Sequence, residues 1–229
     1  MFDGHWRTNL DKGLKPIGQG LRRTGLQADH LTGLGIGMAV ASAVAIGMGA
    51  LRGGLVLLLL TGMCDFLDGA LAKASGITNS KRGAFFDSVT DRLTDALLFG
   101  GVAWYIASTR PGLMVMLPMA LLGAASLVSY QRAKADSLGF DARGGLMERA
   151  ERFIMLGFGL LFNEILIGVL WVMLALTIFT AGQRFVKVWR QAERPQPLPL
   201  ERRPGTRARR RSTRPARQAW KERNVRHSR

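Results

Sequence analysis

The chain has 229 residues, is 48% hydrophobic and carries a formal net charge of +16. Such apolar content with so much charge excludes an ordinary soluble domain and favours a membrane protein with basic loops. The one cysteine, Cys64, lies inside an apolar run, which excludes a disulfide framework.

Residues 1–27 are predicted to form an amphipathic helix on the membrane surface. Trp6, Leu10 and Leu14 recur at roughly helical spacing, and Lys and Arg side chains fall between them. This pattern is typical of helices that lie in the membrane interface. The segment has no apolar core followed by a small-residue cleavage site, so we expect no secretory signal peptide.

Six apolar stretches follow, and we expect each to be a transmembrane helix. The last two are divided only by a short polar break at Asn163 and Glu164. The predicted fold class is an all-α integral membrane protein with a six-helix domain over residues 28–192. The stretches cover residues 31–51, 54–75, 83–108, 113–134, 148–162 and 165–188.

The distribution of charge predicts the orientation in the membrane. Six spans put both termini on one side, together with the basic loop 73–82 and the basic region 132–152. The opposite loops carry little charge beyond Arg52 and Arg110. Because basic loops stay in the cytoplasm, we expect a multi-pass protein of the cell membrane with both termini cytoplasmic.

Residues 193–229 differ in composition from the rest of the chain. They contain thirteen Lys or Arg residues, three acids and five of the eight prolines. We expect a basic, disordered cytoplasmic tail. Attraction to anionic lipid headgroups and plain solvation are alternative roles for it, and no nucleic-acid partner is expected.

Two groups of aspartates interrupt the apolar stretches near one membrane face. Asp65 and Asp68 are spaced i, i+3, and Asp87, Asp91 and Asp95 are spaced i, i+4. On helices each group shares one face, and carboxylates in such segments are costly unless a cation or a function retains them. Two facing carboxylate pairs form an oxygen cage suited to hard divalent cations such as Mg²⁺.

Two readings without transfer chemistry compete with this cage. In the first, the acids merely form ion pairs with neighbouring cations. In the second, the protein is an ion or metal transporter, which would need acids near the bilayer middle and a path to the far side. The acids lie instead at one face, beside basic residues, which favours transfer chemistry. The candidate ion-pair partners are Lys73, Lys81, Arg82 and Arg92.

The aspartate region resembles the motif of the CDP-alcohol phosphotransferases, integral membrane enzymes of phospholipid synthesis. The family pattern is D-x2-D-G-x2-A-R-x8-G-x3-D-x3-D. This chain departs from it with Lys in place of the Arg, and with nine residues rather than eight before the second glycine. The matching residues are Asp65, Asp68, Gly69, Ala72, Lys73, Gly83, Asp87 and Asp91.

The resemblance implies a mechanism at these residues. Two divalent ions, Mg²⁺ or Mn²⁺, would be bound by Asp65, Asp68, Asp87 and Asp91. Asp91 would also accept the proton of the attacking hydroxyl. Gly69, Ala72, Lys73 and Gly83 would contact CDP-diacylglycerol. The resemblance also implies a homodimer. For Asp95 two roles stay open: support of the metal site, or an ion pair with Arg92.

A second group of charged residues lies at the same predicted face. Some of these side chains only mark the cytoplasmic boundary, but together they are able to line a pocket for a phosphorylated substrate, because Arg binds phosphate with a planar fork. The group consists of Arg132, Lys134, Arg143, Arg149, Arg152, Arg184 and Lys187.

The stretch GG-x2-ER-x-ER at 144–152 resembles the actinobacterial phosphatidylinositol phosphate synthases. That resemblance implies that Arg132, Arg152 and Arg184 bind the phosphate of the acceptor, although those synthases usually have Lys at the first position. Of their T-P-D-x2-T motif, only Asp29 and Thr32 carry over here, as nucleotide contacts.

The expected function is therefore transfer of the phosphatidyl group of CDP-diacylglycerol to a phosphorylated alcohol, with inositol 1-phosphate as the first candidate. The alternative within the family is phosphatidylglycerophosphate synthesis or use of a related acceptor. Membrane lipids are the remaining expected partners.

Overall fold

The structure, a computed structural model, describes residues 28–110 without 75–80, and residues 112–193. The predicted surface helix over 1–27 and the predicted tail from 194 onward lie outside the described residues. Only the helical unit, within residues 1–192, is described below.

The described part of the chain contains six α helices and two short 3₁₀ segments, in agreement with the predicted all-α class. Apolar runs bounded by glycines and charged residues set the helix ends within a few residues of the prediction. The helices are α2 (Ala28–Gly47), α3 (Leu51–Ala74), α4 (Lys81–Thr109), α5 (Met116–Ser137), α6 (Arg149–Leu161) and α7 (Leu166–Ala192), with η1 (Leu113–Val115) before α5 and η2 (Asn163–Ile165) before α7.

The first turn of the bundle corrects two predicted boundaries. The first span was expected to reach residue 51 and the second to begin at residue 54. Instead α2 ends at Gly47 and α3 begins at Leu51. Gly49 adopts a positive φ of 85°, which an L side chain rarely adopts, so the chain turns there rather than later.

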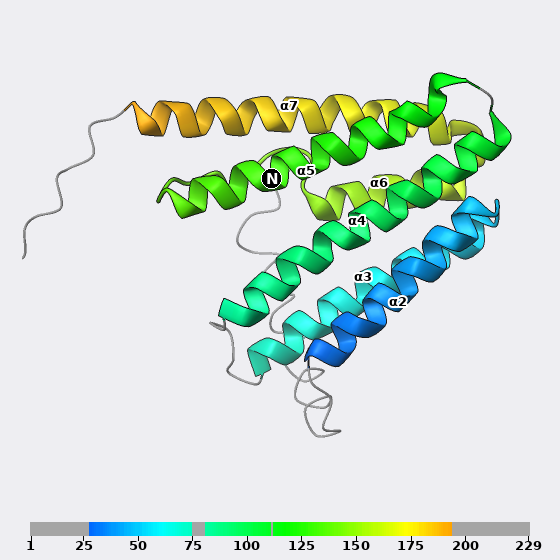
Figure 1. The fold of residues 1–229 in the computed structure, drawn as a ribbon, viewed down its shortest axis with the longest axis horizontal. Coiled ribbons are helices and arrows are strands. Elements are labelled where there is room, and N and C mark those ends of the chain that lie inside the picture. The colour runs from blue at the N-terminus through cyan, green and yellow to red at the C-terminus, as the bar shows by residue number, and fades with distance from the viewer. Residues whose placement is uncertain (1–27, 75–80, 111, 194–229) are drawn as a thin grey trace, which may run out of the picture. The chain divides into compact units, whose positions relative to one another are not determined.

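The helices of the unit pack in two neighbouring groups (Figure 1). Helix α2 lies against both α3 and α4, and α5 lies along α7. Helix α4 also contacts α5, while α6 contacts both α3 and α7 and so joins the groups. A core of Leu, Ile, Val, Met and Phe side chains from all these helices fills the space between them.

Close approach of α2 and α4 depends on Gly101. A Cβ atom at Gly101 would lie 2.5 Å from the carbonyl oxygen of Ala43 and 2.7 Å from its Cα. Real Cβ atoms do not approach backbone so closely, so only glycine allows these two helices to touch here.

Among the residues that the structure describes, four helical segments are long and apolar enough to cross a membrane: Asp29–Gly47, Leu51–Leu71, Leu113–Ser137 and Asn163–Ala192. Helix α4 has 29 residues but carries the charges of the aspartate motif. Helix α6 has 13 residues, about 20 Å of helix, which is short against a hydrocarbon core of about 30 Å. The count of six spans stays a prediction.

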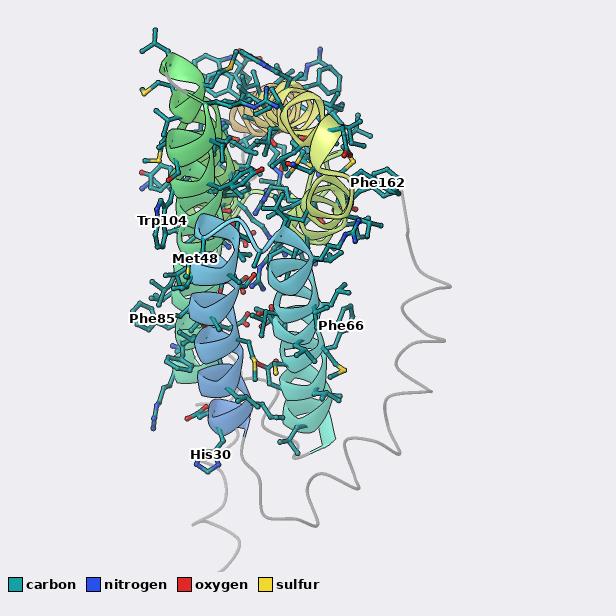
Figure 2. All side chains as sticks on the ribbon, turned by 90° about the vertical axis from the view of Figure 1, so that its right-hand side faces the viewer. His30, Met48, Phe66, Phe85, Trp104 and Phe162 are labelled. Atoms are coloured by element: carbon teal, nitrogen blue, oxygen red, sulfur yellow. The ribbon has the colours of Figure 1, made fainter. Side chains whose placement is uncertain are left out.

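Large apolar side chains point outward from the bundle, as lipid-facing residues do. Phe66, Phe85 and Trp104 extend away from their helices (Figure 2) and are 60%, 70% and 50% exposed. In water such a surface would be costly, whereas in a bilayer it is solvated by lipid tails. The apolar helices and this surface fit a multi-pass membrane protein.

Candidate active site

The acids of the motif lie at one end of the helical unit. Asp65 and Asp68 belong to the C-terminal half of α3, and Asp87 and Asp91 to the first turns of α4. In the unit this end also receives the C-terminus of α5 and the N-terminus of α6 (Figure 1). Helical register puts each pair on one face of its helix, as the spacing predicted.

A guanidinium group lies between the two acid pairs. Nη1 of Arg149, the first residue of α6, is 2.8 Å from Oδ2 of Asp65 and also contacts Oδ1 of Asp91. The Arg149 guanidinium lies 5.0 Å from the centre of the Phe153 ring, one turn further along α6. Carboxylates from two helices therefore contact one nitrogen supplied by a third helix.

Three of the predicted donor-substrate residues, Asp29, Thr32 and Gly69, have contacts or space that the structure describes. Thr32 donates a hydrogen bond to Oδ2 of Asp68 at 2.8 Å. Asp29, one turn earlier on α2, lies 3.6 Å from Nη2 of Arg82. A Cβ added at Gly69 would meet nothing within 4 Å, so there is open space over that position for a ligand.

The acids have the chemistry of a divalent-cation site. Carboxylate oxygens are the ligands that Mg²⁺ and Mn²⁺ prefer, and a cation, the Arg149 nitrogen, already bridges Asp65 and Asp91. Within the described residues no three His, Cys, Asp or Glu side chains lie close enough to hold an ion. Because Mg²⁺–oxygen distances are about 2.0–2.1 Å, metal binding would require the carboxylates to move closer together. With that change the residues fit a metal.

A cavity of about 560 Å³ opens beside the acids. Asp87 and Asp91 line one part of it, and Ser126, Ser129 and Tyr130 of α5 line another. Its volume falls in the range of ordinary small-molecule sites. The arginines in its lining outnumber the acids in its lining. They are Arg92, Arg132, Arg149, Arg152 and Arg184.

The three arginines predicted to bind the acceptor phosphate meet in this cavity, although they come from α5, α6 and α7. Arg132 is exposed and forms no ion pair with the described residues. Arg152 and Arg184 are only 2% and 4% exposed. The Nε atom of Arg152 is buried and finds no hydrogen-bond partner in the described part of the chain, which leaves a donor for a ligand.

Arg184 lines the cavity and also forms hydrogen bonds with the residues around it. Its three nitrogens donate to the carbonyl of Gly144 at 3.0 Å, the carbonyl of Val128 at 3.0 Å and Oε1 of Glu148 at 2.7 Å. These bonds tie the loop between α5 and α6 to α7. A guanidinium has five N–H donors, so two remain after these contacts.

The same loop is fixed to α7 at its outer end. Lys187 donates to Oδ2 of Asp141 at 2.8 Å and to the carbonyl of Arg143 at 2.8 Å. The hydrogen bond from Lys187 holds the pKa of Asp141 below its usual range. The side chain of Gln191 exchanges two hydrogen bonds with the backbone of Asp141. The loop between α5 and α6 thus has a defined position on α7.

Asp95 pairs with Arg152 and not with Arg92, the ion-pair partner that was one of the two alternatives left open by the sequence. Nη2 of Arg152 donates to Oδ2 of Asp95 at 2.8 Å, and both side chains are almost fully buried. Arg92 lies instead near Asp91, at 3.6 Å. The reason is helical register, since Asp95 lies one turn beyond Asp91, where α6 brings Arg152.

Some predicted site residues cannot be compared in this way. Ala72 and Lys73 belong to α3, but their side chains lie outside what the structure describes, and so does the loop 75–80. Gly83 lies in the first turn of α4.

Sequence reasoning included Arg149 only in the basic group of the predicted phosphate pocket and missed its contact with the motif acids. The repeated Glu-Arg pairs at 148–152 are the sequence feature that could have indicated its position. Arg149 and Arg152 are spaced i, i+3 and therefore share one face of α6.

A family model for CDP-alcohol phosphatidyltransferases matches residues 26–181 of the chain. A phosphatidylinositol phosphate synthase of Mycobacterium marinum is 32% identical over 184 residues, which are 76% of this chain and 78% of that protein. An archaetidylinositol phosphate synthase of Methanothermobacter thermautotrophicus is 35% identical over 174 residues, covering 74% of this chain and 86% of the relative.

Solved structures agree with these matches. A crystal structure of Mycobacterium tuberculosis phosphatidylinositol phosphate synthase with CDP-DAG bound aligns with a TM-score of 0.71 at 31% identity, over 81% of this chain and 98% of that one. A structure of the same enzyme with manganese and citrate aligns with a TM-score of 0.72 at 31% identity, over 81% and 94% of the two chains.

Proposed function

The chain belongs to the CDP-alcohol phosphatidyltransferase family, and we propose that it transfers the phosphatidyl group of CDP-diacylglycerol to inositol 1-phosphate. The products are phosphatidylinositol phosphate and CMP. The transferase class follows from the family. The donor and the acceptor are our assignment.

One observation carries the assignment: the cavity is lined both by aspartates of the motif and by arginines from four different helices. Guanidinium groups held together repel one another, so their convergence is favourable around a strong anion. An acceptor anchored there by its phosphate has a hydroxyl within the same cavity as Asp91. A free polyol would need hydroxyl-matching amides or acids instead.

The proposed metal ligands are the four motif aspartates, Asp65, Asp68, Asp87 and Asp91. Two ions, Mg²⁺ or Mn²⁺, would hold the donor diphosphate and offset the charge that develops on the leaving CMP. The manganese in the aligned relative supports a divalent cation in this family.

For the donor we assign Asp29, Thr32, Gly69, Ala72, Lys73 and Gly83 as contacts. Thr32 already orients Asp68 through a hydrogen bond of 2.8 Å. The open space over Gly69 suits a diphosphate lying close to α3. The relative with bound CDP-DAG supports this donor.

The proposed chemical step is an in-line displacement at the phosphorus that bears the lipid. The acceptor oxygen forms a bond to that phosphorus, and the bond from phosphorus to the bridging oxygen of CMP breaks. Asp91 takes the proton of the acceptor hydroxyl, and CMP leaves as the anion. Asp91 is the only acid in this scheme that both binds metal and moves a proton.

For the acceptor phosphate we assign Arg132, Arg152 and Arg184. Arg132 is exposed and free to close on a ligand, whereas the buried pair with Asp95 holds Arg152 in place. The names of the relatives share the inositol phosphate part and differ in the lipid part, phosphatidyl or archaetidyl, which supports inositol phosphate as the acceptor. Glycerol 3-phosphate also carries a phosphate, so it is the competitor to test.

We further propose that the acid end of the bundle faces the cytoplasm and that the protein is a homodimer. The basic residues at that end support the orientation. The outward apolar side chains on the helices offer surface for lipid or for a second copy.

The kinetic test is alanine substitution of Arg152 with a matched control. Arg152→Ala should raise KM for inositol 1-phosphate at least tenfold and change KM for CDP-diacylglycerol little, because only acceptor binding loses an anchor. Arg52→Ala, at the opposite end of α3, makes the same change of charge outside the cavity and should leave both constants unaltered. Equal acceptor KM in the Arg152 variant and the parent would contradict the assignment.

A further inference from the structure

Arg149 is placed differently from the other arginines of the cavity. The others contact backbone carbonyls, one carboxylate or no acid, whereas Nη1 of Arg149 contacts carboxylates from two different helices. Asp65 and Asp91 are both assigned above as metal ligands. A guanidinium nitrogen and a divalent ion therefore have the same partners.

We propose that Arg149 is a built-in counter-ion that competes with the divalent cation for Asp65 and Asp91 and is released to the phosphate-binding cavity when the cation binds. This inference rests on the proposed function, since it takes the aspartates as metal ligands. It adds a coupling between two steps: binding of the metal ion releases the Arg149 guanidinium, which then becomes available to the substrate anion.

Electrostatics give the reason for the competition. Without a cation, carboxylates that are largely withdrawn from water repel one another and lose solvation. Arg149 lowers that cost because it holds a positive charge against these carboxylates where little water reaches them. Its side chain is only 23% exposed, and the Asp65 and Asp91 side chains are 31% and 19% exposed. A bound divalent ion supplies positive charge to the same oxygens, two charges against the single charge of the guanidinium, so Arg149 and the ion cannot both occupy the position between them.

The geometry also provides a destination for the released side chain. Arg149 lines the cavity with Asp87, Asp91 and the proposed acceptor arginines. Its Nε is buried and donates to no atom among the described residues. The Phe153 ring, 5.0 Å from the guanidinium, holds the side chain by a cation–π contact that does not involve the carboxylates. Release therefore leaves the charge at the cavity wall.

The first test is binding of Mn²⁺ alone, without substrate, by titration calorimetry on the full chain in detergent. Arg149→Gln should bind Mn²⁺ about tenfold tighter than the parent, a change in Kd that corresponds to about 1.4 kcal/mol. Arg149→Lys keeps the charge and should stay within about threefold of the parent. Arg132→Gln removes the same charge from the cavity without touching the acids, and should change the Kd by less than about threefold.

The second test uses the unaltered protein and so does not depend on the folding of a variant. Phenylglyoxal modifies accessible arginines, and peptide mass spectrometry reports each site. Addition of Mn²⁺ should increase modification of Arg149 several-fold, while Arg152, held by Asp95, should not change.

The outcomes separate this inference from the proposed function. If the parent binds Mn²⁺ but Arg149→Gln binds it no tighter, or if Mn²⁺ leaves the reactivity of Arg149 unchanged, the competition is wrong and the proposed function stands. If the parent binds no Mn²⁺ at all, both are wrong.

Discussion

The buried pair of Asp95 and Arg152 gives the sharpest prediction about stability. Its side chains are 4% and 3% exposed, and the bond between Oδ2 and Nη2 is 2.8 Å long. Asp95→Ala leaves the Arg152 guanidinium buried without a counter-ion, which should lower the free energy of unfolding by about 3–5 kcal/mol. Arg152→Ala should have a loss of similar size, because the carboxylate is then the unpaired charge.

The double variant distinguishes a paired charge from ordinary packing. Removing both side chains leaves no unpaired charge, so it should cost clearly less than the sum of the single losses, with a coupling energy of about 2 kcal/mol or more. The assay is unfolding by SDS titration in mixed micelles, followed by tryptophan fluorescence. Lys187 and Asp141 form the matched control, because their contact is also 2.8 Å but the side chains are 43% and 58% exposed; their coupling should be much smaller. Additive losses for Asp95 and Arg152 would refute the reasoning.

Three further predictions concern the metal ligands, the tail and the helix contact. Substitution of any one of the four motif aspartates by Asn should abolish CMP release, while thermal unfolding in detergent shows that the variant is folded. Near-normal turnover in any two of these variants would refute the carboxylate cage for the metal ions. The substituted residues are Asp65, Asp68, Asp87 and Asp91. Truncation after Ala192 should leave turnover in detergent intact, because the tail is basic and poor in apolar residues; a folded but inactive truncation would refute this. Gly101→Ala should destabilise the bundle by about 1–3 kcal/mol, because the added Cβ meets the backbone of Ala43, whereas Gly123→Ala, with nothing within 4 Å, should not.

Much of the fold was predictable because membrane helices are long and apolar. The span expected over residues 83–108 is helix α4, Lys81–Thr109, and the break at 163–164 is the 3₁₀ segment before α7. The turn at Gly49 was missed because Ala50 and Leu51 continue the apolar run, and only the backbone angle shows where it ends. Composition cannot locate a turn inside an apolar sequence.

The site was predictable where helical spacing decides it and not where neighbouring helices do. The i, i+3 and i, i+4 registers put the motif acids on shared faces. Convergence of Arg132, Arg152 and Arg184 in one cavity was expected from the resemblance, and the structure brings them together. The partner of Asp95 was not decided by the sequence, because it depends on the packing of α6 near α4. The bridge by Arg149 has the same origin.

The most direct test of the account is acceptor competition with labelled CDP-diacylglycerol and Mn²⁺. Inositol 1-phosphate, glycerol 3-phosphate and free inositol are offered together, and the labelled lipid products are separated and identified by mass spectrometry. We predict phosphatidylinositol phosphate as the main product, with release of an equal amount of CMP and no product from free inositol. Phosphatidylglycerophosphate as the main product would assign the alternative acceptor. Use of free inositol as well as its phosphate would contradict the phosphate anchor at Arg132, Arg152 and Arg184.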